Sequence, residues 1–126
     1  IRKMADVYTK PKKTVHIVAD LYGIEEGLIS RVKEVKRILR GAIEKAKLSV
    51  VGSRFFQFNP HGVTGIFLLK ESHISIHTWP EYGYAAVDIF TCKNDKSAFI
   101  AYNYLLEKLK PKKVKKKIMV REVWKK

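Results

Sequence analysis

The chain has 126 residues, of which 46% are hydrophobic, and a formal net charge of +14. This length and composition predict one globular domain over residues 1–126 and exclude a disordered tail. A disulfide-built scaffold is also excluded, because Cys92 is the only cysteine. No apolar run reaches the roughly 20 residues that a membrane span needs, and no apolar secretion block opens the sequence. We therefore expect a soluble cytoplasmic protein with no membrane partner.

The positive charge suggests a polyanion such as nucleic acid as a partner. Much of it lies in two clusters, Lys10–Lys13 and Lys110–Lys117, which contain prolines and lie at the boundaries of predicted elements. No recognition-helix pattern, zinc spacing or aromatic RNA-binding signature accompanies them. We expect a solvated basic surface and no specific nucleic-acid partner, with a module that binds RNA non-specifically as the minor alternative.

The first half of the chain predicts a strand, a long helix and two more strands. Residues 14–21 alternate apolar and polar side chains, which is the period of a strand. Residues 26–47 carry an apolar stripe at helical spacing and predict one amphipathic helix. Residues 49–58 predict a second strand and residues 59–62 a turn. Residues 63–69 are nearly all apolar and predict a strand buried on both faces.

The second half predicts three more strands and one helix. They are strands at 72–79, 84–92 and 115–123, and a helix that runs from a cap at Asn94 or Asp95 to about residue 108. The predicted fold class is α+β: a two-layer α/β sandwich in which a mainly antiparallel sheet carries two helices on one face.

Reactive side chains gather in the middle of the chain. The stretch reads Glu71-Ser72-His73-Ile74-Ser75-Ile76-His77-Thr78-Trp79-Pro80-Glu81, and Cys92 follows. Each of these residues also has an ordinary structural explanation, as a turn serine, a half-exposed strand histidine or a small buried thiol.

Two general kinds of site fit this stretch poorly. A catalytic triad would draw on Ser72 or Ser75, His77, and Asp88 or Asp95. It is a weak interpretation, because the chain has no Gly-x-Ser-x-Gly elbow. A metal held by His73 and His77 is also weak, since no third ligand is obvious, and no metal is expected.

The order of four segments is more specific. They are Phe58-Asn59-Pro60-His61-Gly62-Val63-Thr64-Gly65, Glu71-Ser72-His73, Ile76-His77-Thr78-Trp79-Pro80-Glu81-Tyr82-Gly83 and Asp88-Ile89-Phe90-Thr91-Cys92. Together they resemble the prokaryotic S-adenosylmethionine decarboxylases. The first strand and both helices fall where that family has them, so the resemblance covers nearly the whole chain. Members of the family are made as proenzymes that cleave themselves to generate a pyruvoyl cofactor.

The resemblance implies cleavage between Glu71 and Ser72, which gives a β chain of residues 1–71 and an α chain of residues 72–126. The Ser72 hydroxyl attacks the Glu71 carbonyl carbon, a base removes the Ser72 α-proton, and elimination leads to a pyruvoyl group. By resemblance the base is His77, and an imidazole suits proton transfer at neutral pH. Thr64 stands where many relatives have serine, and its hydroxyl would support processing.

The resemblance also implies decarboxylation of S-adenosylmethionine for spermidine biosynthesis, in a homodimer of αβ protomers with sites at the shared interface. The pyruvoyl group made from Ser72 would bind the substrate as a Schiff base, and Cys92 would donate the proton that replaces the carboxylate. Phe58 and Trp79 would pack the adenine. Glu81 would contact the ligand, since a sulfonium is otherwise repelled by a basic protein. Arginine decarboxylation, as in some archaeal relatives, is the alternative.

Ser72 and His77 are five residues apart, and a straight strand places such residues on opposite faces. If His77 acts on Ser72, a bend or bulge near Ser72 is required.

Overall fold

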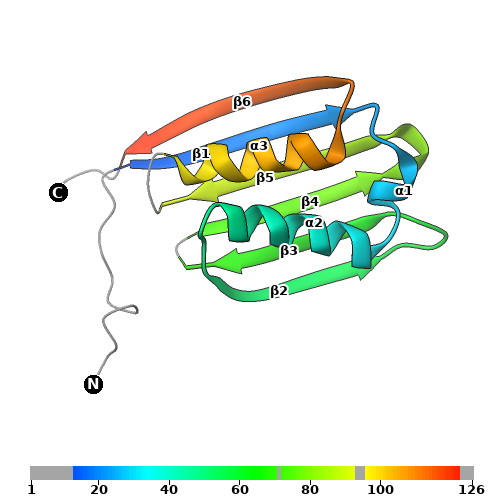
Figure 1. Ribbon diagram of the computed structural model, residues 1–126, viewed down its shortest axis with the longest axis horizontal. Helices are drawn as coiled ribbons and strands as arrows, with labels where there is room; N and C mark the ends of the chain where they lie inside the picture. The colour runs from blue at the N-terminus through cyan, green and yellow to red at the C-terminus, as the bar shows by residue number, and fades with distance from the viewer. Residues whose placement is uncertain (1–12, 71, 93–95, 123–126) are drawn as a thin grey trace.

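The computed structural model describes residues 13–70, 72–92 and 96–122. The elements in order are β1 (Lys13–Tyr22), α1 (Glu26–Ile29), α2 (Val32–Lys45), β2 (Val50–Gln57), β3 (Val63–Leu69), β4 (Ser72–Trp79), η2 (Pro80–Tyr82), β5 (Tyr84–Thr91), α3 (Ser97–Leu109) and β6 (Lys113–Glu122). The strands in this part of the chain form one antiparallel sheet in the order β2-β3-β4-β5-β1-β6. The two long helices, α2 and α3, lie side by side across one face of it (Figure 1). The predicted two-layer α+β sandwich is confirmed.

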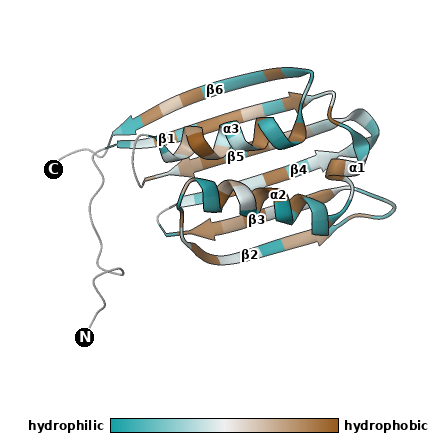
Figure 2. Cartoon of the chain, in the orientation of Figure 1, coloured by the Kyte–Doolittle hydropathy of each residue, from teal (hydrophilic) through white to brown (hydrophobic). Residues whose placement is uncertain are grey.

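The hydrophobic core lies between the helices and the sheet. Side chains alternate between buried and more exposed along β1, β4 and β5, because successive residues of a strand point to opposite faces. The largest buried side chains include Ile17, Leu21, Phe67, Leu69, Ile74, Ile76 and Ile89 from the sheet and Leu39, Ile43, Leu105 and Leu109 from the helices. Figure 2 shows the hydrophobic stretches of β1 and β3 that underlie the helices. Burial of each such side chain stabilises the fold by about 1.5–3 kcal/mol.

The other side of the sheet, which we call the open face, carries no helix within the described residues (Figure 1). Its central strands present His16, Val18, Asp20, Thr64, Ile66, Leu68, His73, Ser75, His77, Trp79, Tyr84, Asp88 and Phe90. Ile66 and Leu68 are 39% and 52% exposed. The prediction that residues 63–69 are buried on both faces is therefore wrong, because the helices cover only one face of the sheet.

The long helix predicted after the first strand is instead two helices, α1 and α2. The chain breaks at Arg31, whose backbone is extended with φ −123° and ψ 144°. The Gln57 side chain from β2 bridges the break. Its Oε1 accepts a hydrogen bond from the Val32 N–H at 2.8 Å, and its Nε2 donates to the Ser30 carbonyl at 2.9 Å. The amide thus satisfies backbone groups that an interrupted helix leaves without partners.

The remaining boundaries follow the predictions closely. Strands β3 and β4 have the predicted bounds, and β1, β2, β5 and the start of β6 differ by one or two residues. Helix α3 begins at Ser97 with no side-chain cap bond at Lys96, while the predicted caps Asn94 and Asp95 and the strand residue Val123 lie outside the described residues. Within the described ranges, no helix has the length and apolar character that crossing a membrane requires.

Candidate active site

A cavity of about 290 Å³ opens where β4 runs into η2. It is lined by Phe58, Asn59, Pro60, His61, Gly62, Thr64, His77, Thr78, Trp79 and Glu81. The walls therefore come from the turn after β2, the start of β3, the end of β4 and η2. Two segments that are separate in the sequence, 58–65 and 76–83, meet in this cavity.

The pairing of β3 with β4 places Thr64 directly opposite His77. The Thr64 Oγ1 lies 3.0 Å from His77 Nδ1, and the ring tautomer decides which atom donates. The hydroxyl orients the imidazole at the edge of the cavity while leaving Nε2 available for other contacts. This is the arrangement that a positioned general base requires.

The cavity rests on a hydrogen-bonded floor. Thr78 is 6% exposed, and its Oγ1 accepts from the Val63 N–H at 2.9 Å and donates to the Ile29 carbonyl at 2.7 Å. Gly62, whose φ of +113° favours glycine, donates its N–H to the Ser30 carbonyl at 3.0 Å. These bonds tie the turn, β3 and β4 to the end of α1, so the walls of the cavity are held by the core.

Aromatic rings form one side of the site. Trp79 stacks on Tyr84 with ring centroids 5.3 Å apart, and Tyr84 stacks on Tyr22 at the same separation. The Tyr84 hydroxyl donates to Asp20 at 2.6 Å; this hydrogen bond, with burial as a second cause, raises the pKa of Tyr84 to about 12. The stack holds the Trp79 ring, 41% exposed, at the cavity, and Phe58 is exposed to a similar degree.

Glu81 faces a histidine that was not predicted as a site residue. The His61 Nε2 lies 3.5 Å from Glu81 Oε1, and its Nδ1 lies 4.0 Å from Glu26 Oε1. The Glu81 side chain is half exposed, so its carboxylate remains accessible to a cationic ligand. The signal for His61 was its place in the 59–62 turn, inside one of the resembling segments.

Ser72 and Cys92 meet at the other end of β4. Ser72 is 5% exposed, and its Oγ accepts a hydrogen bond from the Cys92 N–H at 3.3 Å. Cys92, which follows β5, is partly buried. Because β4 and β5 are paired neighbours, residues twenty apart in the sequence become adjacent. Glu71, the other residue of the predicted cleavage bond, lies outside the described residues.

The structure does not bring Ser72 and His77 together within one chain. Five residues of strand span roughly 16 Å. The β3–β4 register runs without a shift from Leu69 opposite Ser72 to Thr64 opposite His77, so the described strand has no bulge there. Ser72 also points to the helix side and His77 to the open face. We call Ser72 and Cys92 the cleavage end, and Phe58, Thr64, His77, Trp79 and Glu81 the pocket end.

The weakly supported triad is not assembled in the described chain. The Asp88 carboxylate contacts His16 at 2.6 Å and His73 at 3.2 Å, and not His77. Asp95 lies outside the described residues. The group of His16, Asp88 and His73 was missed because its members come from three strands, and only the cross-strand register shows that they converge.

Fold and site together define a class: a small two-layer α+β domain with an imidazole, a hydroxyl and a carboxylate around a cavity, and a buried serine beside a cysteine. The sequence profile of the S-adenosylmethionine decarboxylase family matches residues 15–122. The chain belongs to this family of carboxy-lyases, as the resemblance predicted.

Similar proteins support the assignment. The S-adenosylmethionine decarboxylase proenzyme of Sulfurihydrogenibium sp. (strain YO3AOP1) is 53% identical over 109 residues, which cover 86% of this chain and 82% of the relative. The proenzyme of the same name from Archaeoglobus fulgidus is 53% identical over 96 residues, which cover 76% and 86%. The crystal structure of the adenosylmethionine decarboxylase from Aquifex aeolicus VF5 matches with a TM-score of 0.86 at 41% identity, over 92% of this chain and 96% of that chain.

Proposed function

We propose that this chain is a proenzyme that cleaves itself between Glu71 and Ser72 and then decarboxylates S-adenosylmethionine for spermidine biosynthesis. The observation that carries the proposal is the hydrogen bond from the Cys92 N–H to the Ser72 Oγ. It places the residue whose thiol would donate a proton next to the serine that would become the pyruvoyl group. The relatives reported above are named for S-adenosylmethionine, which does not favour arginine as the substrate.

In the first step, the Ser72 Oγ attacks the carbonyl carbon of Glu71 and the peptide nitrogen leaves it, which turns the amide into an ester. A base then removes the Ser72 α-proton, and β-elimination expels residue 71 as a carboxylate that keeps the serine oxygen. The resulting dehydroalanine tautomerises to an imine, and water replaces its nitrogen as ammonia to leave the pyruvoyl group. The Cys92 N–H, 3.3 Å from Ser72 Oγ, supports this step by fixing the hydroxyl.

His77 is the proposed base, supplied by a second copy of the chain. Within one chain roughly 16 Å of straight strand separates it from Ser72. A homodimer in which the pocket end of one copy meets the cleavage end of the other removes this obstacle. Exposed apolar side chains on the open face, among them Val18, Ile66 and Leu68, support pairing of two copies, because monomers rarely expose large contiguous apolar patches.

The pocket end would bind the substrate. Trp79 and Phe58 offer exposed ring surface to a nucleobase, and the Glu81 carboxylate offers negative charge to a sulfonium cation. Once formed, the pyruvoyl group supplies the electron-accepting carbonyl on which the loss of carbon dioxide depends. The residues fit this group, since its precursor Ser72 is buried beside Cys92, whose Sγ would return a proton to the substrate carbon.

Intact mass under denaturing conditions tests the cleavage. We expect two chains, 1–71 and 72–126, with the second blocked at its N-terminus by a pyruvoyl group. A single full-length mass after prolonged incubation would contradict the proposal. Release of labelled carbon dioxide from carboxyl-labelled S-adenosylmethionine and from arginine then tests the substrate, and turnover of arginine alone would contradict it.

A further inference from the structure

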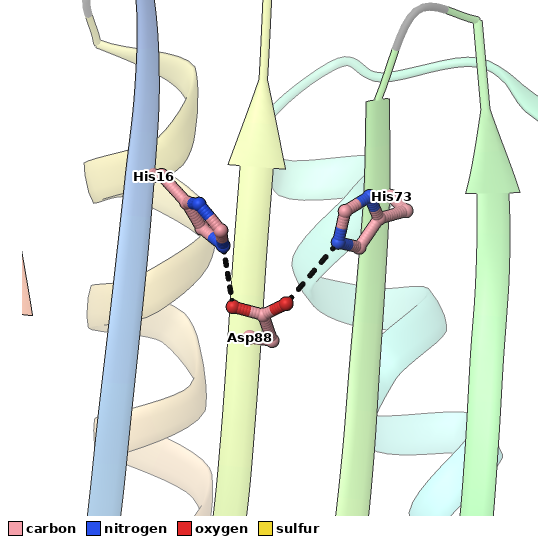
Figure 3. A group of neighbouring side chains, drawn as sticks. All are labelled: His16, His73 and Asp88. Carbon is pink, nitrogen blue, oxygen red and sulfur yellow. Dashed lines mark hydrogen bonds and ion pairs between the residues drawn. The ribbon is translucent and has the colours of Figure 1, made fainter. Parts of the chain in front are cut away.

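The open face carries a second group of chemically reactive side chains, made by His16 of β1, His73 of β4 and Asp88 of β5 (Figure 3). His16 and His73 both lie opposite Phe90, one from each strand that flanks β5. Asp88 lies two residues before Phe90 on the same face, and both rings point toward its carboxylate (Figure 3). The sheet register therefore brings two imidazoles and a carboxylate to one point.

From this geometry we propose that His16, His73 and Asp88 form a binding site for a divalent transition-metal ion of the zinc class. One ligand atom from each residue lies within 4.8 Å of the others, and the contacts of the two Nε2 atoms with the carboxylate oxygens are 2.6 and 3.2 Å. Ligand atoms around a tetrahedral zinc lie roughly 3.3 Å apart, given metal–ligand bonds of about 2.0–2.1 Å. Small rotamer adjustments thus suffice to coordinate an ion.

The ligand set selects the kind of ion. Imidazole nitrogens suit Zn²⁺, Co²⁺, Ni²⁺ and Cu²⁺, whereas Mg²⁺ and Ca²⁺ prefer an all-oxygen shell. The positive charge near the site also favours ions that imidazole nitrogens coordinate. Arg121 lies over the Phe90 ring at 5.5 Å, and Lys117 pairs with Val18, next to Asp88 in the sheet. These cations oppose an ion held by charge alone and leave coordination by the two imidazoles as the main source of affinity.

The ligands are held in place before any ion binds. The His73 ring stacks on Phe90 with centroids 5.7 Å apart, and the His16 ring meets Phe90 edge-on at 5.4 Å. In a single chain the side chains of His16, His73 and Asp88 are 22%, 32% and 36% exposed, which admits an ion and leaves a fourth position for water or for a ligand from the copy that the proposed dimer would bring to this face. All three residues belong to one chain, so the proposed site does not rest on the proposed decarboxylase function.

The test uses the untagged full-length chain after treatment with a chelator. Titration with Co²⁺ should give saturable visible d–d absorption with one ion per chain, displaced by Zn²⁺, and Mg²⁺ should produce no change. His16→Gln and Asp88→Asn should each weaken binding by more than the roughly 10–100-fold that loss of a supporting second-shell group costs. His61→Gln is the matched control, because His61 also lies beside carboxylates, and it should bind Co²⁺ as the unaltered chain does.

A gain-of-signal variant keeps the test decisive if a ligand substitution impairs folding. His73→Cys should retain binding and add a near-ultraviolet thiolate-to-cobalt charge-transfer band that the unaltered chain lacks. The proposal is overturned if Co²⁺ shows no saturable binding, if His16→Gln and Asp88→Asn bind normally, or if folded His73→Cys shows no new band. In those cases the three side chains form only a hydrogen-bonded network.

Discussion

The two ends of β4 differ in how much of an active site a single chain supplies. The pocket end has a hydrogen-bonded imidazole, a supported floor and a cavity, all built by one chain. The cleavage end has a buried serine and its neighbour Cys92, and within the described residues no imidazole contacts Ser72. A single strand thus carries two half-sites on opposite faces, and this separation is the reason why we propose that the chemistry draws on two copies of the chain.

Ser72→Ala should have the largest effect, since it removes the atom that attacks Glu71. Cleavage should be lost completely, as read by intact mass. Ser75→Ala is the matched control, because Ser75 lies on the open face of the same strand and takes no part in the proposed reaction. Normal cleavage of Ser72→Ala would show that the chain breaks elsewhere or by another route.

Cys92→Ala should separate making the cofactor from using it. The backbone N–H that contacts Ser72 remains, so cleavage should still occur. Decarboxylation should fall by roughly 10²–10⁴-fold, the usual contribution of a positioned proton donor. Mass and release of labelled carbon dioxide measure the two effects on the same sample, and full activity after cleavage would remove Cys92 from the mechanism.

Glu81→Gln should affect the pocket end alone. Loss of a charge-assisted contact costs about 1.5–3 kcal/mol, so kcat/KM for S-adenosylmethionine should fall roughly 10–100-fold while cleavage proceeds normally. Steady-state kinetics on fully cleaved protein measure the change. An unchanged kcat/KM would mean that the carboxylate does not contact the substrate.

Tyr84→Phe should have the smallest effect, on stability at high pH. The pKa of Tyr84 is raised from its ordinary value of 10 to about 12, so the stabilisation is fully present below pH 10 and is lost as the pH rises toward 12. The variant lacks this group, and its unfolding midpoint in urea should therefore fall less steeply between pH 10 and 12. Parallel curves for both proteins would contradict the assigned role of the Asp20 hydrogen bond.

Local pattern predicted the fold well and the site in part. The bounds of β3 and β4 follow from apolar alternation between clear turns. The break at Arg31 could not be predicted from local pattern. It depends on the Gln57 side chain, which accepts a hydrogen bond from the Val32 N–H and lies 25 residues further along the chain. The convergence of His16, His73 and Asp88 was hidden for the same reason: it depends on strand register, which a single sequence does not display.

Complementation between two inactive variants tests the two-copy account most directly. A size-tagged His77→Ala chain is expressed alone or together with Ser72→Ala, and cleavage is read by mass. Alone, the His77→Ala chain should stay intact. Together, about half of it should be cleaved, the share that random pairing places in mixed dimers, because its Ser72 then meets an intact His77. Cleavage of His77→Ala alone, or none in mixed dimers, would contradict the account.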